Sequence, residues 1–221
     1  TVSHRNKFQL AGKPFQYGAS LNMTYAKSKW LRYLDQPNMQ EWRKRVGTSV
    51  AACDVWSADG LFRSEEEIDN SAWYGSRPNV GDIKYRDLNG DGRITNEDQT
   101  LISDCGMQPR IQYGLGCYVK WKDFDLGVFF TGSAKRTIYM SPMNPFGADT
   151  GSEWGAGERQ LAKWIDDQRW SESNADPDAT YPRLGTLYTD VKNNLVTSSY
   201  WLRNGSFVRW KTLEVGYQYK K

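Results

Sequence analysis

The chain has 221 residues and carries 29 Lys and Arg against 26 Asp and Glu, a formal net charge of +3 at pH 7. Charges of both signs are scattered, so no basic face is available to neutralise a row of phosphates, and no nucleic acid partner is expected. The mean hydropathy of −0.75 and the absence of any run of about 20 apolar residues exclude a transmembrane helix but not a β-barrel, whose strands need only about 9–11 alternating residues.

Five segments of alternating apolar and polar residues predict β-strands, in chain order near residues 2–10, 15–26, 110–121, 124–133 and 206–219. The first two are separated by a break at Gly12-Lys13-Pro14. A tight turn at Lys122-Asp123 joins the third and fourth into a hairpin with one apolar face. That face holds Ile111, Tyr113, Leu115, Cys117, Val119, Trp121, Phe124, Leu126, Val128 and Phe130.

Two very long connections, residues 27–109 and 132–205, join these strands. Any one strand alone is typical of half an ordinary antiparallel sheet. Short turns at one end and long connections at the other are typical of outer-membrane barrels, which have short periplasmic turns and longer extracellular loops. Since closure begins at about eight strands, the predicted fold is all-β: an antiparallel transmembrane β-barrel fragment, about five strands of a larger barrel, with long extracellular loops.

Few residues suggest catalysis or a framework of disulfides. The three cysteines, Cys53, Cys105 and Cys117, do not have metal-ligand spacing, and a Cys53–Cys105 bridge is left open. His4 is the only histidine, and the run Glu65-Glu66-Glu67 is typical of a solvated face rather than of paired catalytic carboxylates. We therefore expect no catalytic residues and no enzyme activity. A short helix is predicted within residues 157–169, where apolar residues recur at helical spacing.

Residues 87–98 match a twelve-residue calcium loop. Hard oxygen ligands are supplied at alternate positions by three side chains, Gly92 permits a sharp bend, and a carbonyl and a final carboxylate complete the set. The predicted metal ligands are Asp87, Asn89, Asp91, Arg93 through its carbonyl, and Asp98. A bidentate Glu and an entering helix are lacking, so this is not a complete EF-hand. The alternative is an acidic turn held by Asx hydrogen bonds alone.

Tryptophans gather in or beside the two long connections. Their rings are suited to stacking on sugars, to anchoring at a membrane interface or to packing the loops together, and packing is the expectation for most of them. They are Trp30, Trp42, Trp56, Trp73, Trp154, Trp164, Trp170 and Trp201.

Several short sequences lie in a characteristic order along the chain. They are Ala58-Asp59-Gly60-Leu61-Phe62, Glu66-Glu67-Ile68, Gly81-Asp82-Ile83-Lys84-Tyr85 before the acidic loop, Tyr113-Gly114-Leu115, Phe124-Asp125-Leu126 with Phe129-Phe130, Tyr181-Pro182-Arg183-Leu184, and Ser199-Tyr200-Trp201-Leu202-Arg203-Asn204-Gly205-Ser206-Phe207 before Lys211-Thr212-Leu213. In this order they resemble the C-terminal part of a SusC/RagA-type TonB-linked outer-membrane transporter. The resemblance covers nearly the whole chain and is most specific from Ala58 onward.

The resemblance implies that residues 1–221 are part of one TonB-dependent receptor barrel domain of about 22 strands, with the plug domain absent from these residues. It implies an outer-membrane importer of Bacteroidetes for glycans or oligosaccharides, or for peptides, which works with a SusD-like surface lipoprotein and is driven by TonB through the missing N-terminal part. The expected location is the bacterial outer membrane, in contact with its lipid. Calcium would then brace an extracellular loop as a structural cofactor.

A soluble secreted calcium-stabilised carbohydrate-binding module is the alternative, because it also explains the acidic loop and the tryptophans. The two hypotheses differ in where the apolar strand residues lie. A soluble module requires Leu115, Val119, Trp121, Leu126 and Val128 to be packed beneath a second sheet, whereas a barrel requires them to form a lipid-facing band.

Overall fold

The computed structural model describes residues 1–102, 108–140, 162–185 and 192–219. The chain divides into two compact units. We call them the sheet unit, Thr1–Ser28, Gly106–Ile138 and Asn204–Lys221, and the loop unit, Lys29–Cys105 and Tyr139–Arg203. No helix in the described ranges is both long and apolar enough to cross a membrane.

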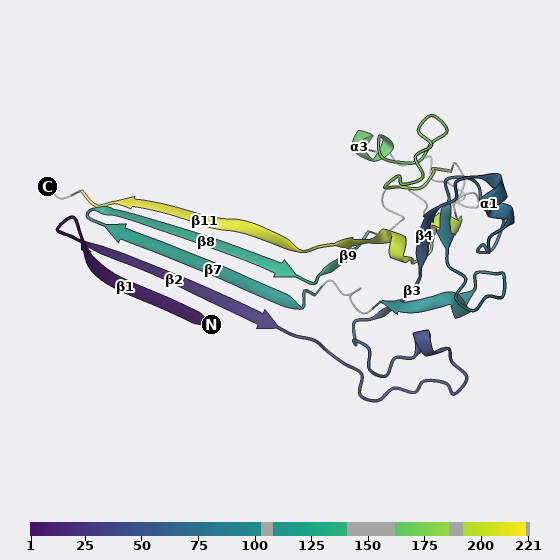
Figure 1. The fold of residues 1–221 in the computed structure, drawn as a ribbon, viewed down its shortest axis with the longest axis horizontal. Helices are drawn as coiled ribbons and strands as arrows, with labels where there is room; N and C mark the ends of the chain where they lie inside the picture. Colours follow the sequence, from purple (N-terminus) through teal and green to yellow (C-terminus); the bar gives the residue numbers. More distant parts are fainter. Residues whose placement is uncertain (103–107, 141–161, 186–191, 220–221) are drawn as a thin grey trace, which may run out of the picture. The chain divides into compact units, whose positions relative to one another are not determined.

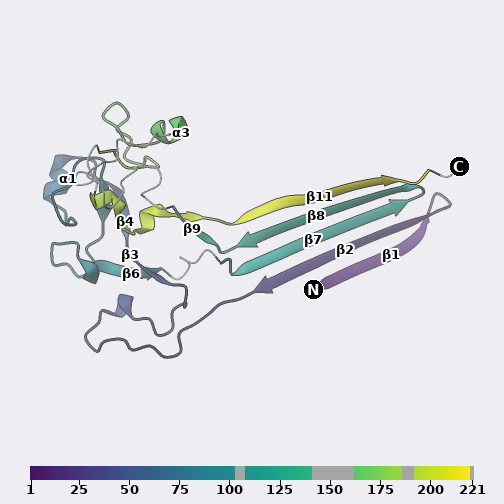
Figure 2. The same cartoon turned by 180° about the vertical axis from the view of Figure 1, so that it is seen from behind.

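The sheet unit is one antiparallel sheet of five strands in the order β1-β2-β7-β8-β11, which lie side by side in both views (Figures 1 and 2). The strands are β1 Val2–Leu10, β2 Lys13–Tyr25, β7 Ile111–Trp121, β8 Phe124–Ala134 and β11 Phe207–Tyr217. Their bounds lie within about two residues of those predicted, because alternation sustained over 9 to 13 residues is a strong strand signal.

Both short turns lie at one end of this sheet, where β11 also ends (Figure 1). Ala11 and Gly12 join β1 to β2 with positive φ values of 50° and 70°, as a two-residue hairpin turn that follows the strand twist requires. Lys122, with φ 54°, begins the turn between β7 and β8. We call this the turn end of the sheet, and the opposite end, from which both long connections leave, the loop end.

The register separates the sheet into an apolar face and a polar face, because direct antiparallel partners point to the same side. One row of partners across all five strands is entirely aromatic: Phe8, Phe15, Trp121, Phe124 and Tyr217. Further rows on this apolar face include Leu21, Leu115, Phe130 and Trp210, and Cys117, Val128 and Leu213. The polar face carries Ser3, Arg5, Lys7, Gln16, Ser20, Lys120, Asp125, Thr131, Arg209, Thr212 and Glu214, with Tyr118, Phe129 and several glycines.

No second sheet covers the apolar face among the described residues. Leu115 and Leu126 are 39% and 42% exposed, and Val215 is 73% exposed. All the buried core hydrophobics of the described chain lie instead in the loop unit. The closed core that a soluble module requires is therefore not what these strands form.

The two long connections contain short strands, helices and 3-10 turns, of which the sequence indicated only the helix within residues 157–169. Two-stranded antiparallel pairs are formed by β3 (Cys53–Trp56) with β6 (Gln99–Ile102) and by β4 (Ala58–Leu61) with β5 (Ile83–Tyr85), and β9 (Thr137–Tyr139) pairs with β10 (Leu202–Asn204). The helices are α1 (Glu65–Asp69) and α3 (Lys163–Asp166), with 3-10 turns η1 (Glu41–Arg43), η2 (Asn96–Asp98), η4 (Lys192–Leu195) and η5 (Ser199–Trp201).

The loop unit has a hydrophobic core of its own, so the long connections are folded rather than loose. Its buried members are Trp56, Leu61, Ile83, Tyr85, Ile94, Ile165, Ala179, Tyr181 and Trp201. Of the predicted helix within residues 157–169, residues 163–166 are helical as α3, and residues 157–161 lie outside the described residues.

Candidate functional site

The acidic loop, residues 87–98, is organised by side chains that accept hydrogen bonds from its own backbone. Asp87 accepts from the amides of Gly90, at 2.6 Å to Oδ1, and Gly92, at 2.8 Å to Oδ2. Oδ1 of Asp91 accepts from the Arg93 amide at 2.8 Å, and Asn89 accepts from the Asp91 amide at 3.0 Å. These nested Asx turns bend the chain tightly, with Gly90 and Gly92 at φ 76° and 80°.

Asp98 closes the loop from inside. Its carboxylate is fully buried and accepts hydrogen bonds from the amides of Leu88 at 2.9 Å and Thr95 at 2.8 Å. Together with the Thr95 side chain it forms a capping box for η2. Ile94, 4% exposed, belongs to the loop-unit core. The loop is thus tied to the core at its second half and exposed at its first.

The five predicted ligands therefore lie in one loop, but the side-chain oxygens of four of them accept hydrogen bonds from its amides. Among the described residues no group of three or more His, Cys, Asp or Glu side chains is gathered as a metal site requires. The donor set of carboxylate, amide and carbonyl oxygens is the hard one that calcium prefers. Asp87 and Asp91 retain lone pairs besides those that accept the amide protons, since a carboxylate offers about four acceptor sites.

A second polar site, the Asp82 network, lies buried in the loop unit and was not foreseen from the sequence. Asp82 is 1% exposed, and its carboxylate meets Arg183 through Nε at 2.7 Å and Nη2 at 3.2 Å. It also accepts hydrogen bonds from Nδ2 of Asn194 and the amide of Asn79, both at 2.8 Å. Burial raises the pKa of the Asp82 carboxyl, while the Arg183 guanidinium opposes that shift.

The Asp82 network extends to the short strand β5. Oδ1 of Asn194 accepts from the Ile83 amide at 2.8 Å, Asn193 donates to the Ile83 carbonyl at 2.7 Å, and the Tyr85 hydroxyl donates to the Asn193 carbonyl at 2.7 Å. Burial raises the pKa of the Tyr85 phenol, so it stays a donor at neutral pH. The network fixes segments more than 100 residues apart in sequence, which is a structural role.

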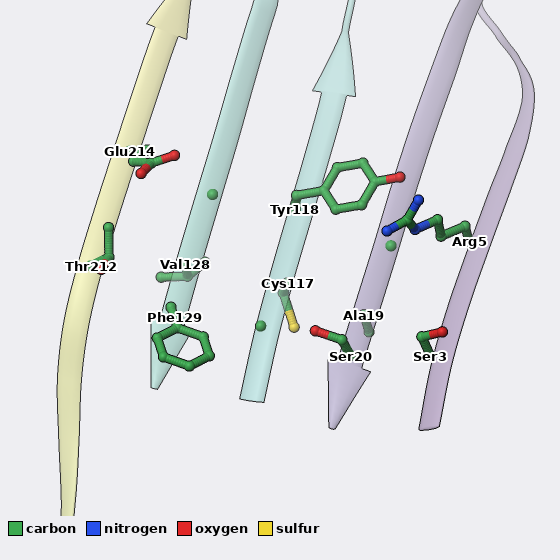
Figure 3. Close-up of a pocket in the computed structure, with 13 residues that line it drawn as sticks. Ser3, Arg5, Ala19, Ser20, Cys117, Tyr118, Val128, Phe129, Thr212 and Glu214 are labelled. Carbon is green, nitrogen blue, oxygen red and sulfur yellow. The ribbon is translucent and has the colours of Figure 1, made fainter. Parts of the chain in front are cut away.

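The polar face of the sheet contains a hollow of about 270 Å³. Its floor includes Gly18, Gly116 and Gly127, and aromatic rings lie over two of these glycines: a Cβ on Gly18 would be 2.3 Å from the Tyr118 ring, and one on Gly116 would be 3.5 Å from the Phe129 ring. Figure 3 shows Tyr118 extending from β7 toward Arg5, and Phe129 extending from β8 toward β7. Arg5 and Glu214 line the hollow as well.

The other residues considered from the sequence are mostly structural. Trp56 and Trp201 are core residues, and the Trp42 indole donates to the Glu97 carbonyl at 3.0 Å. His4 is exposed on β1 and lies 3.4 Å from the Tyr17 hydroxyl. The run of three glutamates forms the first turn of α1, where acidic residues are favoured. Trp154 lies outside the described residues.

Of the cysteines, Cys53 is disulfide-bonded and Cys117 has a free thiol. Cys105, which the sequence suggested as the partner of Cys53, lies outside the described residues. The bond adds a covalent constraint to β3, which pairs with β6 and contributes Trp56 to the loop-unit core.

The sequence is similar to two curated receptors of Formosa agariphila. It is 28% identical over 172 residues to TonB-dependent receptor P26, covering 78% of this chain and 16% of the receptor. It is 21% identical over 224 residues to TonB-dependent receptor P3, covering 96% of this chain and 20% of the receptor. The chain thus spans about a fifth of the length of these relatives. No family model matches it.

Two solved structures share the fold. A chain of the RagAB peptide transporter matches 97% of this chain with a TM-score of 0.60 and 16% identity, over 21% of its own length. The RagAB peptide importer in its closed-closed state matches with a TM-score of 0.56 and 16% identity, over 22% of that chain. The resemblance to TonB-linked transporters and the predicted fold class, an antiparallel sheet matching part of such a barrel, are confirmed.

Proposed function

We propose that this chain is part of an outer-membrane, TonB-dependent nutrient importer that acts with a SusD-like lipoprotein. The observation that carries the proposal is the five-stranded sheet with one apolar and one polar face, whose described residues form no buried hydrophobic core of their own. Strands of 11 to 13 residues are long enough to cross a bilayer, and an apolar band edged by aromatic residues suits contact with lipid.

The proposed placement puts the turn end of the sheet in the periplasm and the loop unit outside the cell. Long connections are extracellular in outer-membrane barrels, and the loop unit consists of the two longest. The polar face then lines the interior of the barrel. Relatives known as receptors or transporters rather than enzymes support an import role, in keeping with the lack of a catalytic arrangement in the sequence.

The proposed cargo is a glycan or oligosaccharide, with a peptide as the alternative. Aromatic rings beside charged and hydroxyl groups on the polar face, as at Tyr118 and Phe129, suit sugar stacking. The peptide alternative is favoured by the likeness to RagAB, a peptide transporter. Co-expressing the full-length receptor with its lipoprotein and measuring uptake of labelled oligosaccharides and peptides would decide between them.

Two adjacent residues on β11 test the membrane placement. Leu213 lies on the apolar face and Thr212 on the polar face. In the full-length receptor, Leu213→Arg should reduce folded protein in the outer-membrane fraction, because arginine on the lipid side costs about 2–4 kcal/mol near the midplane. Thr212→Arg is the matched control and should assemble normally. Equal assembly of both variants, measured by heat-modifiable mobility on gels, would contradict the placement.

We also propose that calcium binds residues 87–98 through Asp87, Asn89, Asp91, the Arg93 carbonyl and Asp98. The bound cation would draw the loop's carboxylates together, neutralise their charge and stiffen the exposed first half of the loop. Calorimetric titration of the full-length receptor with calcium tests this. Asp91→Ala should weaken binding at least about tenfold, whereas Glu66→Ala, an exposed acid outside the loop, should not. Identical curves for all three proteins would mean that the loop is held by its Asx turns alone.

A further inference from the structure

Residues 29–34, which we call the leucine segment, expose large apolar side chains although the segment belongs to the folded loop unit. Leu34 is 94% exposed and Leu31 80% exposed, and Tyr33 between them is 45% exposed. Exposed leucines occur singly on most proteins, but two almost fully exposed leucines three positions apart, beside an aromatic ring, are typical of a contact surface.

The leucine segment is held in place rather than frayed. The backbone of Trp30 exchanges hydrogen bonds with Thr48 and Gly47, both at 2.9 Å. Just beyond the segment, the Asp35 carboxylate accepts from the amides of Arg45 at 3.0 Å and Val46 at 3.2 Å. Rings of Trp30 and Tyr33 pack at 5.2 Å between centroids. The leucines are thus presented outward by a hydrogen-bonded base.

The charge of the leucine segment is entirely positive. Lys29 and Arg32 are both exposed and, among the described residues, form no ion pair. The nearest acidic groups along the chain are engaged elsewhere: Asp35 with backbone amides, and Glu41 with Lys44. Two cations interspersed with exposed leucines and a tyrosine are typical of a segment that lies in the interface of an anionic membrane.

Chain length keeps the segment within reach of that interface. Trp30 follows the last residue of β2, Tyr25, by five positions, and five residues span at most about 18 Å. Under the proposed function, on which this inference rests, Tyr25 ends a lipid-facing strand at the outer leaflet, which in bacterial outer membranes is built of phosphorylated glycolipid.

We infer that residues 29–34 dock on this outer leaflet, with Leu31 and Leu34 entering the acyl boundary and Lys29 and Arg32 binding glycolipid phosphates. Charge complementarity selects this occupant over the surface lipoprotein, because free cations beside leucines match an anionic headgroup above an apolar layer. The segment would anchor the folded loop unit to the membrane surface.

Photocrosslinking in the full-length receptor tests the inference. Benzoylphenylalanine is placed at Leu34, and at Ser173 as an exposed control in the loop unit, and the adducts formed in native outer membranes are identified by mass. We expect a glycolipid adduct at Leu34 and none at Ser173. Lys29→Gln with Arg32→Gln should lower its yield about 25-fold, since each interfacial cation contributes about fivefold, whereas Arg63→Gln with Lys163→Gln should not.

Four outcomes of the crosslinking experiment would contradict docking on the glycolipid leaflet. A protein adduct, a phospholipid adduct, equal yields at Leu34 and Ser173, or a yield that ignores the loss of Lys29 and Arg32 would overturn the inference. Assembly and uptake are measured on the same receptors. Normal assembly and uptake with no glycolipid adduct would reject the leucine segment alone, whereas a receptor missing from the outer-membrane fraction would reject the proposed function and this inference together.

Discussion

Replacing Asp82 with asparagine should loosen the loop unit at a defined place. The substitution keeps the shape of the side chain but removes the charge that faces Arg183, whose side chain is 15% exposed. Removing one partner of a buried ion pair costs about 3–5 kcal/mol, because the other charge is left uncompensated. Asn194 and the Asn79 amide, which both donate to the carboxylate, would also face an amide group that can accept at only one atom.

Hydrogen exchange in the full-length receptor measures this cost locally. The Ile83 amide donates to Asn194, which in turn donates to Asp82, so its exchange reports opening of the Asp82 network. A loss of about 3–5 kcal/mol accelerates exchange by about two to three and a half orders of magnitude when exchange follows the open population. Amides of β7 and β8 in the sheet unit should be unchanged and serve as the internal control.

A second substitution distinguishes the cost of leaving Arg183 unpaired from the cost of losing the ion pair as a whole. Burial raises the pKa of Asp82 despite Arg183, which means that desolvation outweighs the attraction. Asp82→Asn combined with Arg183→Met should therefore restore much of the lost protection, since the second substitution removes the charge that Asp82→Asn leaves buried and uncompensated. If Asp82→Asn left Ile83 exchange within about twofold of the parent, the carboxylate would not be holding β5 and the reasoning would be refuted.

Two further predictions concern other parts of the chain. Gly132→Ala should lower the yield of folded receptor on heat-modifiable gels more than Gly114→Ala does. A Cβ at position 132 would lie 2.5 Å from the backbone oxygen of Phe207, whereas a Cβ at position 114 would lie 3.1 Å from the Phe129 ring, which can move. Equal yields for the two variants would contradict this prediction. For Glu67, burial raises the pKa, but the hydrogen bonds from Lys84 and the Arg63 amide outweigh it and leave the pKa lowered. The ionised Glu67 carboxylate therefore stabilises the fold fully above its usual pKa near 4.3, and this stabilisation is lost as the pH falls through the lowered pKa. Glu67→Gln should remove this acid dependence from the hydrogen exchange of the α1 amides.

The long strands were predictable from sequence because their signal is local. Alternation with period two persists for 11 residues in β7 and in β8, and a turn at Lys122 marks where the chain reverses. The calcium prediction for residues 87–98 rests on a local signal as well, since all its oxygen donors lie within twelve positions, and it stays a prediction.

The loop unit was not predictable in the same way. Its strands have only three or four residues, too few for a period to be read. The Asp82 network depends on Arg183 and Asn194, more than 100 residues along the chain, and nothing local pairs them. One signal was present: Gly81-Asp82-Ile83-Lys84-Tyr85 and Tyr181-Pro182-Arg183-Leu184 are among the sequences that carry the family resemblance, and the network is where they meet.

The two short turns are offset along the sheet, and this offset has a geometric consequence. Phe15 and Trp121 are direct partners, yet Gly12 is three residues from Phe15 whereas Lys122 is one residue from Trp121. Two residues of about 3.4 Å each, over two strand spacings of about 4.8 Å, correspond to an inclination of about 35° when both turns lie at one depth. Closed barrels have strands inclined by about 35–45°, so the stagger between these two turns matches the inclination that strands have in a closed barrel.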